Sequence, residues 1–538
     1  MSRYRGGRGA ARTLLHDGRV LRLPGHDRRP GQPAGLHDGR ARWHEDRAPA
    51  GRAQGAGMIE TTQCDLLVVG AGPAGLAAAT TAARLGVDTV LLDEQAAPGG
   101  QIYRAITTTP VTDRAVLGPD YWHGASLVEP FRQSGARYLP GATVWAVAER
   151  TAPEPRRGFE VAYSVAGEAR ILHARRLLLA TGAQERPFPV PGWTLPGVIT
   201  AGAAQILLKS AGVVPADRTV LAGSGPLLYL VAWQYLNAGV KVDALLETTP
   251  PGRLRQALPK VWGFLRSPYL GKGLSLLRAV KAAIPIVKGV TALEALGQDK
   301  LESVRYTNAA GDTKTLPAQQ LMLHQGVVPN VNLSRAIGAE HRWNAALDCW
   351  EPDVDDWGLT SVDGVGMAGD GAGIAGALAA EQRGRLAALQ AAHLLGRIDA
   401  ARRDSEAAAP RAALARAVRG RAFFDVLYKA PENFRRPTGD TIVCRCEEVT
   451  AAQVRDTVKL GCSGPNQMKA FLRCGMGPCQ GRFCGLTVSE IIAEERGVPV
   501  PEVGYYRLRF PTKPLTLGEL ASLPQTDESR QAVVRLKK

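Results

Sequence analysis

The chain has 538 residues, of which 45% are hydrophobic and 22% charged, so it is long enough for about three folded domains and too apolar to be disordered throughout. No run of eighteen or more apolar residues occurs, so we expect no membrane-spanning helix, and any membrane contact would be peripheral. The net charge of +16 is uneven, with twelve Arg and five acidic residues in 1–57. Elsewhere both signs are mixed, which is typical of a solvated surface, and we expect no nucleic-acid partner.

Residues 1–57 combine Arg, Gly, Pro and His without a helical or strand period, which predicts an unstructured extension. They contain no apolar segment of the kind that a secretory signal needs. We interpret Met58 as the native start, and a basic targeting arm is the alternative. The expected location is the cytoplasm, with peripheral attachment at the inner membrane face left open.

An apolar strand ending at Val69 runs directly into a glycine-rich turn and then an Ala/Leu-rich helix. In such a dinucleotide fingerprint the first glycine makes the tight turn, the second lets a pyrophosphate approach the backbone, and the third lets helix and strand pack closely. A second strand ends in Asp93-Glu94, and Glu94 follows the last glycine by nineteen residues, near the spacing of about 20 for an acid that binds a ribose hydroxyl. The turn reads Gly70-Ala71-Gly72-Pro73-Ala74-Gly75.

Three later motifs favour a flavin over a nicotinamide at this first site. With the fingerprint they resemble the marks of flavoproteins that have two dinucleotide-binding domains. That resemblance implies bound FAD, with Asp370 holding its ribitol. The motifs are Pro98-Gly99-Gly100-Gln101, Ala180-Thr181-Gly182 and Gly364-Val365-Gly366-Met367-Ala368-Gly369-Asp370.

A second strand-turn-helix carries an altered fingerprint. Gly223 and Gly225 are present, but Leu228 replaces the third glycine, and the following strand ends at Glu247. We expect Leu228 to push the helix away from the turn, and Glu247 to repel a 2′-phosphate. An NADH site, a site for another nucleotide such as ATP, and an empty relic all remain open.

No redox cysteine pair, paired carboxylates or nucleophile motif stands out near these sites, so no catalytic residue is assigned. His324 lies in a Gly/Pro-containing segment that is as compatible with a turn as with a place near the flavin ring.

Six of the eight cysteines fall between Cys444 and Cys484, which predicts a metal site. Four thiolates suit either zinc or a 2Fe-2S cluster. The Cys444-Arg445-Cys446 opening, with 32 residues before Cys479, resembles the 2Fe-2S domain of bacterioferritin-associated ferredoxin. On that resemblance the ligands are Cys444, Cys446, Cys479 and Cys484. The gap of four residues between the last two is wider than in that ferredoxin, so Cys474 is an alternative ligand.

We predict an α/β fold of two Rossmann-like domains, an FAD-binding domain with an inserted NAD-like domain, followed by a small helical Cys-rich 2Fe-2S domain. In chain order the predicted parts are the extension (1–57), the FAD-binding domain (58–200 and 336–400, divided by the NAD-like domain, 201–335), a helical linker (401–440), the 2Fe-2S domain (441–500) and a tail (501–538).

This combination resembles the larger flavin subunits of the hydrogen cyanide synthase, opine oxidase and proline or D-hydroxyproline dehydrogenase complexes. The resemblance implies an electron-transferring subunit that receives electrons from a partner FAD subunit similar to D-amino-acid oxidase. A quinone or cytochrome acceptor and a small ferredoxin-like subunit complete the expected partners. A self-sufficient NADH-dependent FAD oxidoreductase is the alternative, and a zinc protein that binds nucleic acid is the least favoured interpretation.

Overall fold

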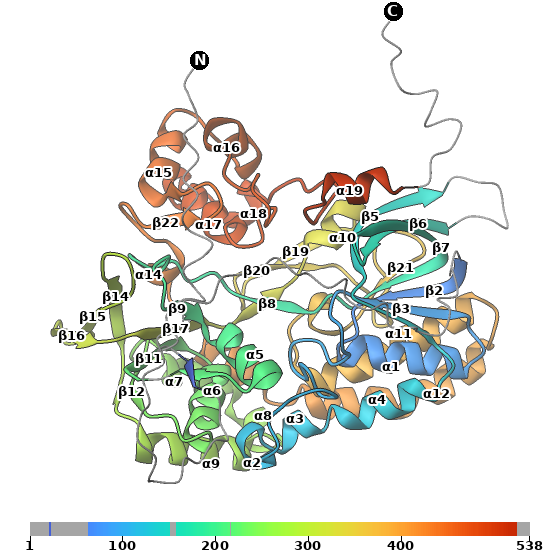
Figure 1. Cartoon of the computed structure of the whole chain (residues 1–538), viewed down its shortest axis with the longest axis horizontal. Coiled ribbons are helices and arrows are strands. Elements are labelled where there is room, and N and C mark those ends of the chain that lie inside the picture. The colour runs from blue at the N-terminus through green and yellow to red at the C-terminus, as the bar shows by residue number, and fades with distance from the viewer. Residues whose placement is uncertain (1–20, 23–62, 151–157, 216, 524–538) are drawn as a thin grey trace, which may run out of the picture.

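The computed structural model describes residues 21–22, 63–150, 158–215 and 217–523. Apart from strand β1 (Leu21–Arg22), the predicted extension and its start at Met58 lie outside the described residues. Figure 1 shows two α/β bodies side by side, with a helical body formed by the later part of the chain above them. The predicted α/β fold with two Rossmann-like units and a helical C-terminal region is confirmed.

The first body contains a seven-stranded sheet whose fingerprint strand lies in the middle, buried on both faces. Successive side chains of a strand point to opposite faces. Leu66 and Val68 therefore pack in one core with the helices, and Leu67 and Val69 pack in a second core with the antiparallel strands. The strand order is β4 (Arg137–Pro140), β3 (Thr89–Asp93), β2 (Gln63–Val69), β7 (Glu168–Leu179), β6 (Gly158–Val165) and β5 (Thr143–Arg150), with β21 (Val365–Met367) also paired to β7.

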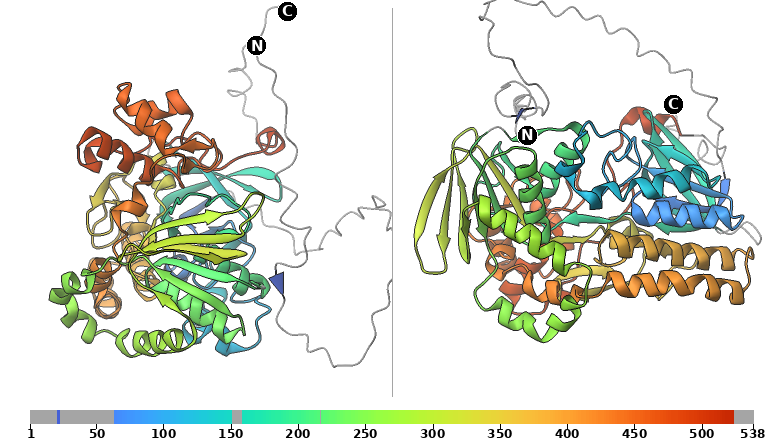
Figure 2. Two further views of the ribbon diagram at one scale, coloured as in Figure 1. Left: turned by 90° about the vertical axis from the view of Figure 1, so that its left-hand side faces the viewer. Right: turned by 90° about the horizontal axis from the view of Figure 1, so that it is seen from below.

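A layer of helices covers one face of this sheet. Helix α1 (Pro73–Arg84) follows β2, α11 (Ala377–Leu394) packs against α1, and α12 (Ala400–Ala417) packs against α11. The right-hand view of Figure 2 shows the three helices side by side. Gly384 of α11 allows this close approach, because a Cβ there would lie 2.1 Å from the carbonyl oxygen of Ala74.

The second body has a five-stranded parallel sheet and a smaller antiparallel one. Helices α5 (Ala201–Ala211) and α6 (Pro226–Asn237) pack against the parallel sheet. Its strand order is β13 (Ile286–Val287), β12 (Val242–Glu247), β11 (Thr219–Ser224), β17 (Gln320–Gln325) and β9 (Val198–Thr200). The antiparallel sheet contains β14 (Val290–Leu296), β15 (Ser303–Asn308) and β16 (Thr313–Pro317).

The chain passes between the two bodies through a pair of short antiparallel strands, β8 (Ala183–Glu185) and β18 (Val327–Pro329). Strand β8 directly follows the predicted Thr181-Gly182 flavin turn. Both connections therefore pass beside that turn.

The helical body begins after helices α13 (Arg421–Leu427) and α14 (Glu432–Arg435). Its buried core includes Val443, Met468, Ile491 and Tyr506. The chain then returns to the first body, where the Thr512 amide donates to the carbonyl oxygen of Trp145 at 2.9 Å. The elements are β22 (Ile442–Cys444), β23 (Val449–Thr450), α15 (Ala451–Lys459), α16 (Pro465–Leu472), α17 (Gly485–Arg496), α18 (Val500–Val503) and, back on the first sheet, α19 (Leu517–Ala521).

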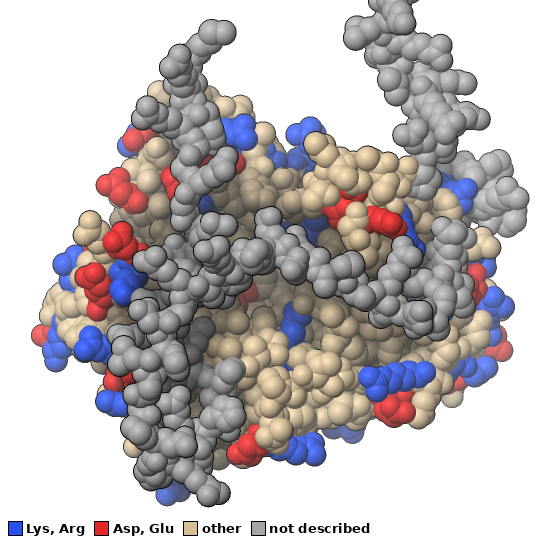
Figure 3. Space-filling model, viewed as in Figure 1, with Lys and Arg blue, Asp and Glu red and all other residues tan. Residues whose placement is uncertain are grey.

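Charges of both signs are interspersed over the described part of the face drawn in Figure 3. Among the described residues, no helix combines the length and the apolarity needed to cross a bilayer.

Candidate functional site

The first fingerprint forms the turn between β2 and α1, and its glycines have different structural roles. Gly70 has a φ of +108°, and a Cβ there would lie 2.4 Å from the carbonyl oxygen of Ala180. A Cβ on Gly75 would lie 1.8 Å from the carbonyl oxygen of Gly70. At Gly72 the nearest atom would be 3.8 Å away, so that position keeps free space for a ligand. No side chain caps the N-terminus of α1, which leaves it suited to a pyrophosphate.

The other predicted flavin motifs converge on this turn. Gly100 packs on it, since a Cβ there would lie 2.8 Å from the Cα of Gly72. Gly369 faces Ala74, because a Cβ on Gly369 would lie 2.8 Å from the Cβ of Ala74. Gly371 lies against Gly182. Segments from four parts of the sequence thus form one cradle at the carboxyl ends of β2, β7 and β21.

The Asp370 carboxylate holds the start of α11. Its Oδ1 accepts hydrogen bonds from the amides of Ala375 (2.8 Å) and Gly376 (2.9 Å). These bonds fix the carboxylate beside the Thr181-Gly182 turn, where the predicted ribitol contact would lie.

The two acids at the end of β3 differ in their partners. Asp93 is buried and accepts hydrogen bonds from the amides of Ala71 (2.5 Å) and Gln95 (2.7 Å), so its carboxylate holds the fingerprint turn. Glu94 instead pairs with Lys513 at 2.6 Å. Burial would raise the pKa of Glu94, but the hydrogen bond and charge of Lys513 more than offset it, and the pKa is lowered. Glu94 therefore stays an anion at the predicted ribose position.

Two lysines at this site were not found from the sequence. Lys513 comes from the tail, far from β3 in sequence, and no local pattern indicates it. Lys209 of α5 is fully buried, and its Nζ donates to the carbonyl oxygens of Ile102 (2.9 Å) and Gln101 (3.3 Å) and to Oε1 of Gln205 (2.7 Å). Burial lowers the pKa of Lys209 to about 7. This lysine ties the second body to the predicted Gly100-Gln101 flavin turn.

The second fingerprint is also built as a glycine turn, between β11 and α6. A Cβ on Gly223 would lie 1.7 Å from the carbonyl oxygen of His324. Leu228 is fully buried in the core, so the substitution for the third glycine serves packing. Glu247 lies near the Tyr229 hydroxyl and acts on it electrostatically. Burial and the charge of Glu247 together raise the pKa of Tyr229.

His324 lies in β17, with its ring beside Gly225 of the second fingerprint. Its Nδ1 lies 2.7 Å from Oε1 of Glu185, and the other oxygen of Glu185 accepts from the Gly202 amide at 3.0 Å. The histidine and glutamate therefore join β17, β8 and α5 in a buried polar contact. Sequence spacing indicated neither this pair nor its place at the second turn.

Five of the cysteines of the helical body form two adjacent groups. The sulfurs of Cys444, Cys474 and Cys484 all lie within 4.8 Å of one another, and all three residues are buried. Cys446 is exposed, and burial together with the neighbouring Cys479 raises the pKa of its thiol. Both members of the Cys-x-Cys opening thus face cysteines of the later loop, one in each group.

Hydrogen bonds from Cys474 and Cys484 are the main cause of a lowered pKa at Cys444. These bonds also contribute to the raised pKa values of their donors, as burial does. A thiolate at neutral pH inside a group of thiols is the donor set that zinc or an iron-sulfur cluster takes up. The residues present therefore fit a four-cysteine site. Cys462 stands apart and donates to the carbonyl oxygen of Gly464 at 3.4 Å.

The cysteine loop docks on the first body next to the flavin turn. Nε2 of Gln184 donates to the carbonyl oxygen of Arg482 at 2.7 Å, and Nδ2 of Asn332 donates to that of Gln480 at 3.1 Å. Gln184 is in β8, two residues after Gly182, and Arg482 comes two residues before Cys484. The predicted flavin and metal sites are thus joined by direct contacts.

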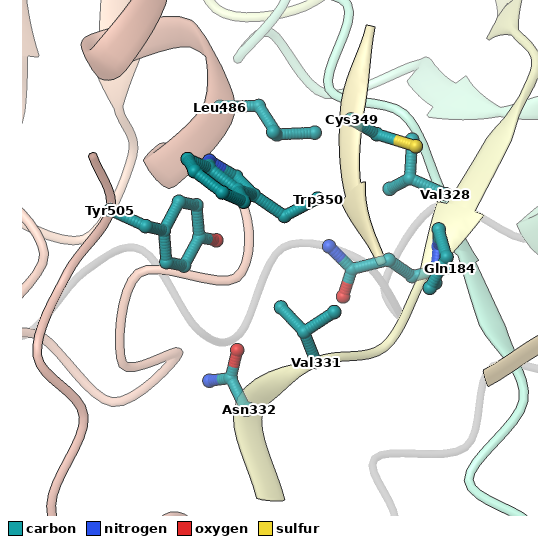
Figure 4. Close-up of a pocket in the computed structure, with 9 residues that line it drawn as sticks. Gln184, Val328, Val331, Asn332, Cys349, Trp350, Leu486 and Tyr505 are labelled. Atoms are coloured by element: carbon teal, nitrogen blue, oxygen red, sulfur yellow. The ribbon is translucent and has the colours of Figure 1, made fainter. Parts of the chain in front are cut away.

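The seam between these bodies is closely packed. Figure 4 shows Tyr505 and Leu486 of the helical body facing Trp350, Cys349 and Gln184 on the other side of the seam. The pocket between them measures about 10 Å³, the space of about one water molecule. Cys349 is buried, with its pKa raised to about 12, as expected for an inert thiol.

The comparisons agree with this geometry. The family model described as pyridine nucleotide-disulphide oxidoreductase matches residues 64–394, and the sarcosine oxidase A3 domain matches residues 438–523. An opine oxidase subunit of Rhizobium meliloti is 48% identical over 87% of this chain and 89% of its own length. Hydrogen cyanide synthase subunit HcnB of Pseudomonas aeruginosa is 35% identical over 85% of this chain and 98% of its own length.

A solved structure shares the fold. L-proline dehydrogenase from P. horikoshii superposes with a TM-score of 0.61 at 18% identity, covering 86% of this chain and 80% of that one. The predicted resemblance to this group is confirmed. The match to the oxidoreductase family also supports FAD as the cofactor of the first body.

Proposed function

The chain belongs to the pyridine nucleotide-disulphide oxidoreductase family and is a flavin-dependent oxidoreductase. From this premise we propose that it is the electron-transferring subunit of a complex that oxidises amines or imino acids. It would carry FAD in the first body and a 2Fe-2S cluster in the helical body. Its partner would be an FAD subunit similar to D-amino-acid oxidase, and the further component would be a small ferredoxin-like subunit. The substrates of the complex would be opines, proline, hydroxyproline or glycine.

One observation carries this proposal. The strand that follows the Thr181-Gly182 flavin turn holds the loop that ends at Cys484, through the Gln184–Arg482 hydrogen bond. A cofactor on each side of this contact would be separated by a packed seam whose pocket has room for about one water molecule. That arrangement suits electron transfer between two sites of one chain.

The residues of the chain hold and position both groups in this proposal. Asp93 and Asp370 keep the two flavin turns in place through backbone amides, and Glu94 offers an anion to a ribose. Four cysteines of the two groups would ligate the cluster, with Cys444, Cys446, Cys479 and Cys484 as the predicted set and Cys474 as the alternative. A flavin accepts two electrons, and an iron-sulfur cluster passes them on one at a time.

The names of the relatives support a multi-subunit assembly, since the opine oxidase and hydrogen cyanide synthase proteins are both described as subunits. Among the described residues we find no arrangement of acid, base and nucleophile at the flavin cradle. A division of labour follows, in which the partner oxidises the C–N bond and this chain carries electrons toward a quinone or cytochrome.

The test compares this chain alone with this chain co-purified with the products of neighbouring genes. Visible absorption and iron content should show flavin and about two irons per chain, the iron content of a 2Fe-2S cluster. Dye reduction by opines, proline, hydroxyproline or glycine should require the partner. Full activity of the lone chain, or purified protein without flavin and iron, would contradict the proposal.

A self-sufficient NADH-dependent oxidoreductase is the second candidate, favoured by the Gly223–Gly225 turn. The buried Leu228 in place of the third glycine counts against it. Anaerobic addition of NADH to the same preparations distinguishes the two. Rapid bleaching of the flavin band would favour NADH as donor, while an unbleached flavin leaves ATP or no ligand for the second turn.

A further inference from the structure

The connection between β12 and β13 has an apolar outer surface. It contains α7 (Arg253–Ala257), the turn Leu258–Lys260, α8 (Val261–Leu265) and α9 (Leu270–Ala283). Fifteen large apolar side chains are exposed in the described part of the chain. Five of them belong to a 21-residue stretch of this connection, from Leu254 to Leu274. We call these five the outer patch: Leu254 (58% exposed), Leu258 (50%), Trp262 (67%), Leu265 (45%) and Leu274 (59%).

The spacing of the patch explains why it is exposed. Leu254, Leu258, Trp262 and Leu265 follow one another at intervals of four, four and three residues, which places them on one face of a helical stretch. The opposite face is already used, because Ala257 is fully buried.

Packing of the inner face holds the connection on the molecule. The Phe264 ring stacks on Phe423 of α13 with ring centroids 4.9 Å apart. A Cβ on Gly420 would lie 2.9 Å from the Cα of Phe264, so this contact is close. The inner face anchors the connection, and the outer face has no comparable partner among the described residues.

The charge of this connection has one sign. Residues 253–281 contain seven Lys and Arg and no Asp or Glu. Lys272 pairs with Asp120. Five other cations are exposed and have no carboxylate partner in the described chain: Arg255, Lys260, Arg266, Arg278 and Lys281.

We propose that the outer patch binds the surface of an anionic lipid bilayer, with its helices lying in the plane of the interface. Exposed Leu and Trp side chains flanked by cations are the combination that such interfacial helices use. Trp favours the boundary between head groups and acyl chains. In Figure 2 the connection lies at the lower edge of the left-hand view, on the outside of the molecule, where a flat surface can reach it.

An anionic bilayer fits better than a protein partner. A protein partner would need an acidic surface matched in shape to these short helices, whereas the connection offers only cations and apolar side chains, with no Asp or Glu in residues 253–281. A bilayer requires only accumulated positive charge and apolar side chains that can enter it. The proposal does not depend on the substrate or on the occupants of the two nucleotide turns.

The first test uses the flavin-loaded full chain and co-sedimentation with extruded vesicles. We expect at least tenfold stronger partition onto equal mixtures of phosphatidylglycerol and phosphatidylcholine than onto phosphatidylcholine alone, and loss of binding at high salt. A triple variant, Arg255→Ser with Lys260→Ser and Arg266→Ser, should bind about 100-fold more weakly, since each cation near an anionic surface contributes about a fivefold factor. The matched control, Arg84→Ser with Lys300→Ser and Lys314→Ser, removes three exposed cations elsewhere and should bind within about twofold of the wild type.

The second test removes the apolar contribution. Leu258→Ser with Trp262→Ser should weaken binding by about tenfold or more, whereas Leu517→Ser, which alters an 85% exposed leucine on α19, should not. Unchanged flavin absorbance and unfolding temperature show that each variant is folded.

Three results would overturn the proposal. Wild-type chain that does not prefer anionic vesicles contradicts it, and so does binding that survives in both patch variants, which would assign it to other residues. Patch variants that lose a co-purifying subunit, while vesicle binding is unchanged, would identify the patch as a protein interface instead.

Discussion

Two glycines of the first fingerprint have separate roles at the residue scale. Gly75→Ala should cost about 3 kcal/mol or more of folding free energy, because its Cβ would lie 1.8 Å from a backbone oxygen. Gly72→Ala has room in the chain itself and an ordinary φ of −74°. We expect it to unfold within about 2 °C of the wild type but to purify with at least tenfold less flavin. Thermal unfolding and flavin absorbance check both variants, and a flavin-loaded Gly72→Ala protein would contradict the assigned role.

Lys209 should make stability depend on pH. Its folded pKa of about 7 lies below the ordinary lysine value of 10.5, so between these values the unfolded chain binds more protons. The cost of burying the charge is therefore full below about pH 7 and falls as the pH rises toward 10. We expect wild-type stability, relative to Lys209→Met, to increase by up to about 1.4 kcal/mol per pH unit over this range.

Denaturant midpoints of the two proteins at several pH values measure this difference. Lys314→Met, at an exposed lysine, is the control and should show no such trend. A flat difference for Lys209→Met would mean that the ammonium keeps its charge up to its ordinary pKa.

At the scale of elements, the cysteine loop decides which thiols can act together. We expect Cys444→Ser and Cys484→Ser to purify without iron, because both residues lie in the buried group and both belong to the predicted ligand set. Cys474→Ser distinguishes the predicted set from the alternative, since its sulfur lies in the same buried group. Cys462→Ser is the control and should keep it.

Iron analysis and visible absorption measure these outcomes. If Cys474→Ser keeps its iron while Cys479→Ser loses it, the predicted set is right and Cys474 is a neighbour only. Removal of iron with a chelator should abolish dye reduction by the complex and leave the flavin band in place.

At the scale of the whole molecule, a buried ion pair fastens the helical body to the rest. Glu490 of α17 is 1% exposed and pairs with Arg435 of α14, with Arg186 at 3.8 Å. Burial would lower the pKa of Arg435, but Glu490 more than offsets it and the pKa is raised. Glu490→Gln removes the more deeply buried of the carboxylates that pair with this guanidinium and leaves Asp348 at 3.3 Å, so we expect a loss of about 3 kcal/mol.

The matched control is Glu502→Gln, which breaks an exposed pair with Arg496 and should cost less than about 1 kcal/mol. Limited proteolysis and thermal unfolding compare the two. Equal effects would show that the seam does not depend on the buried pair.

Local motifs were predictable wherever neighbouring residues determine the conformation. The glycines of both turns, the apolar strand before each and the helix after each follow from backbone sterics and side-chain period, which act over a few residues. The Cys-x-Cys opening and the glycine-rich loop indicated a metal site for the same reason.

The contacts between distant segments were decided only by tertiary packing. The pairing of Lys513 with Glu94 and the docking of Arg482 on Gln184 join segments that carry no shared period or motif. Such contacts depend on how complete helices and strands bury their apolar faces, a property of the assembled core. The sequence by itself determined which chemistry the chain can hold, and the fold decided which residues meet around it.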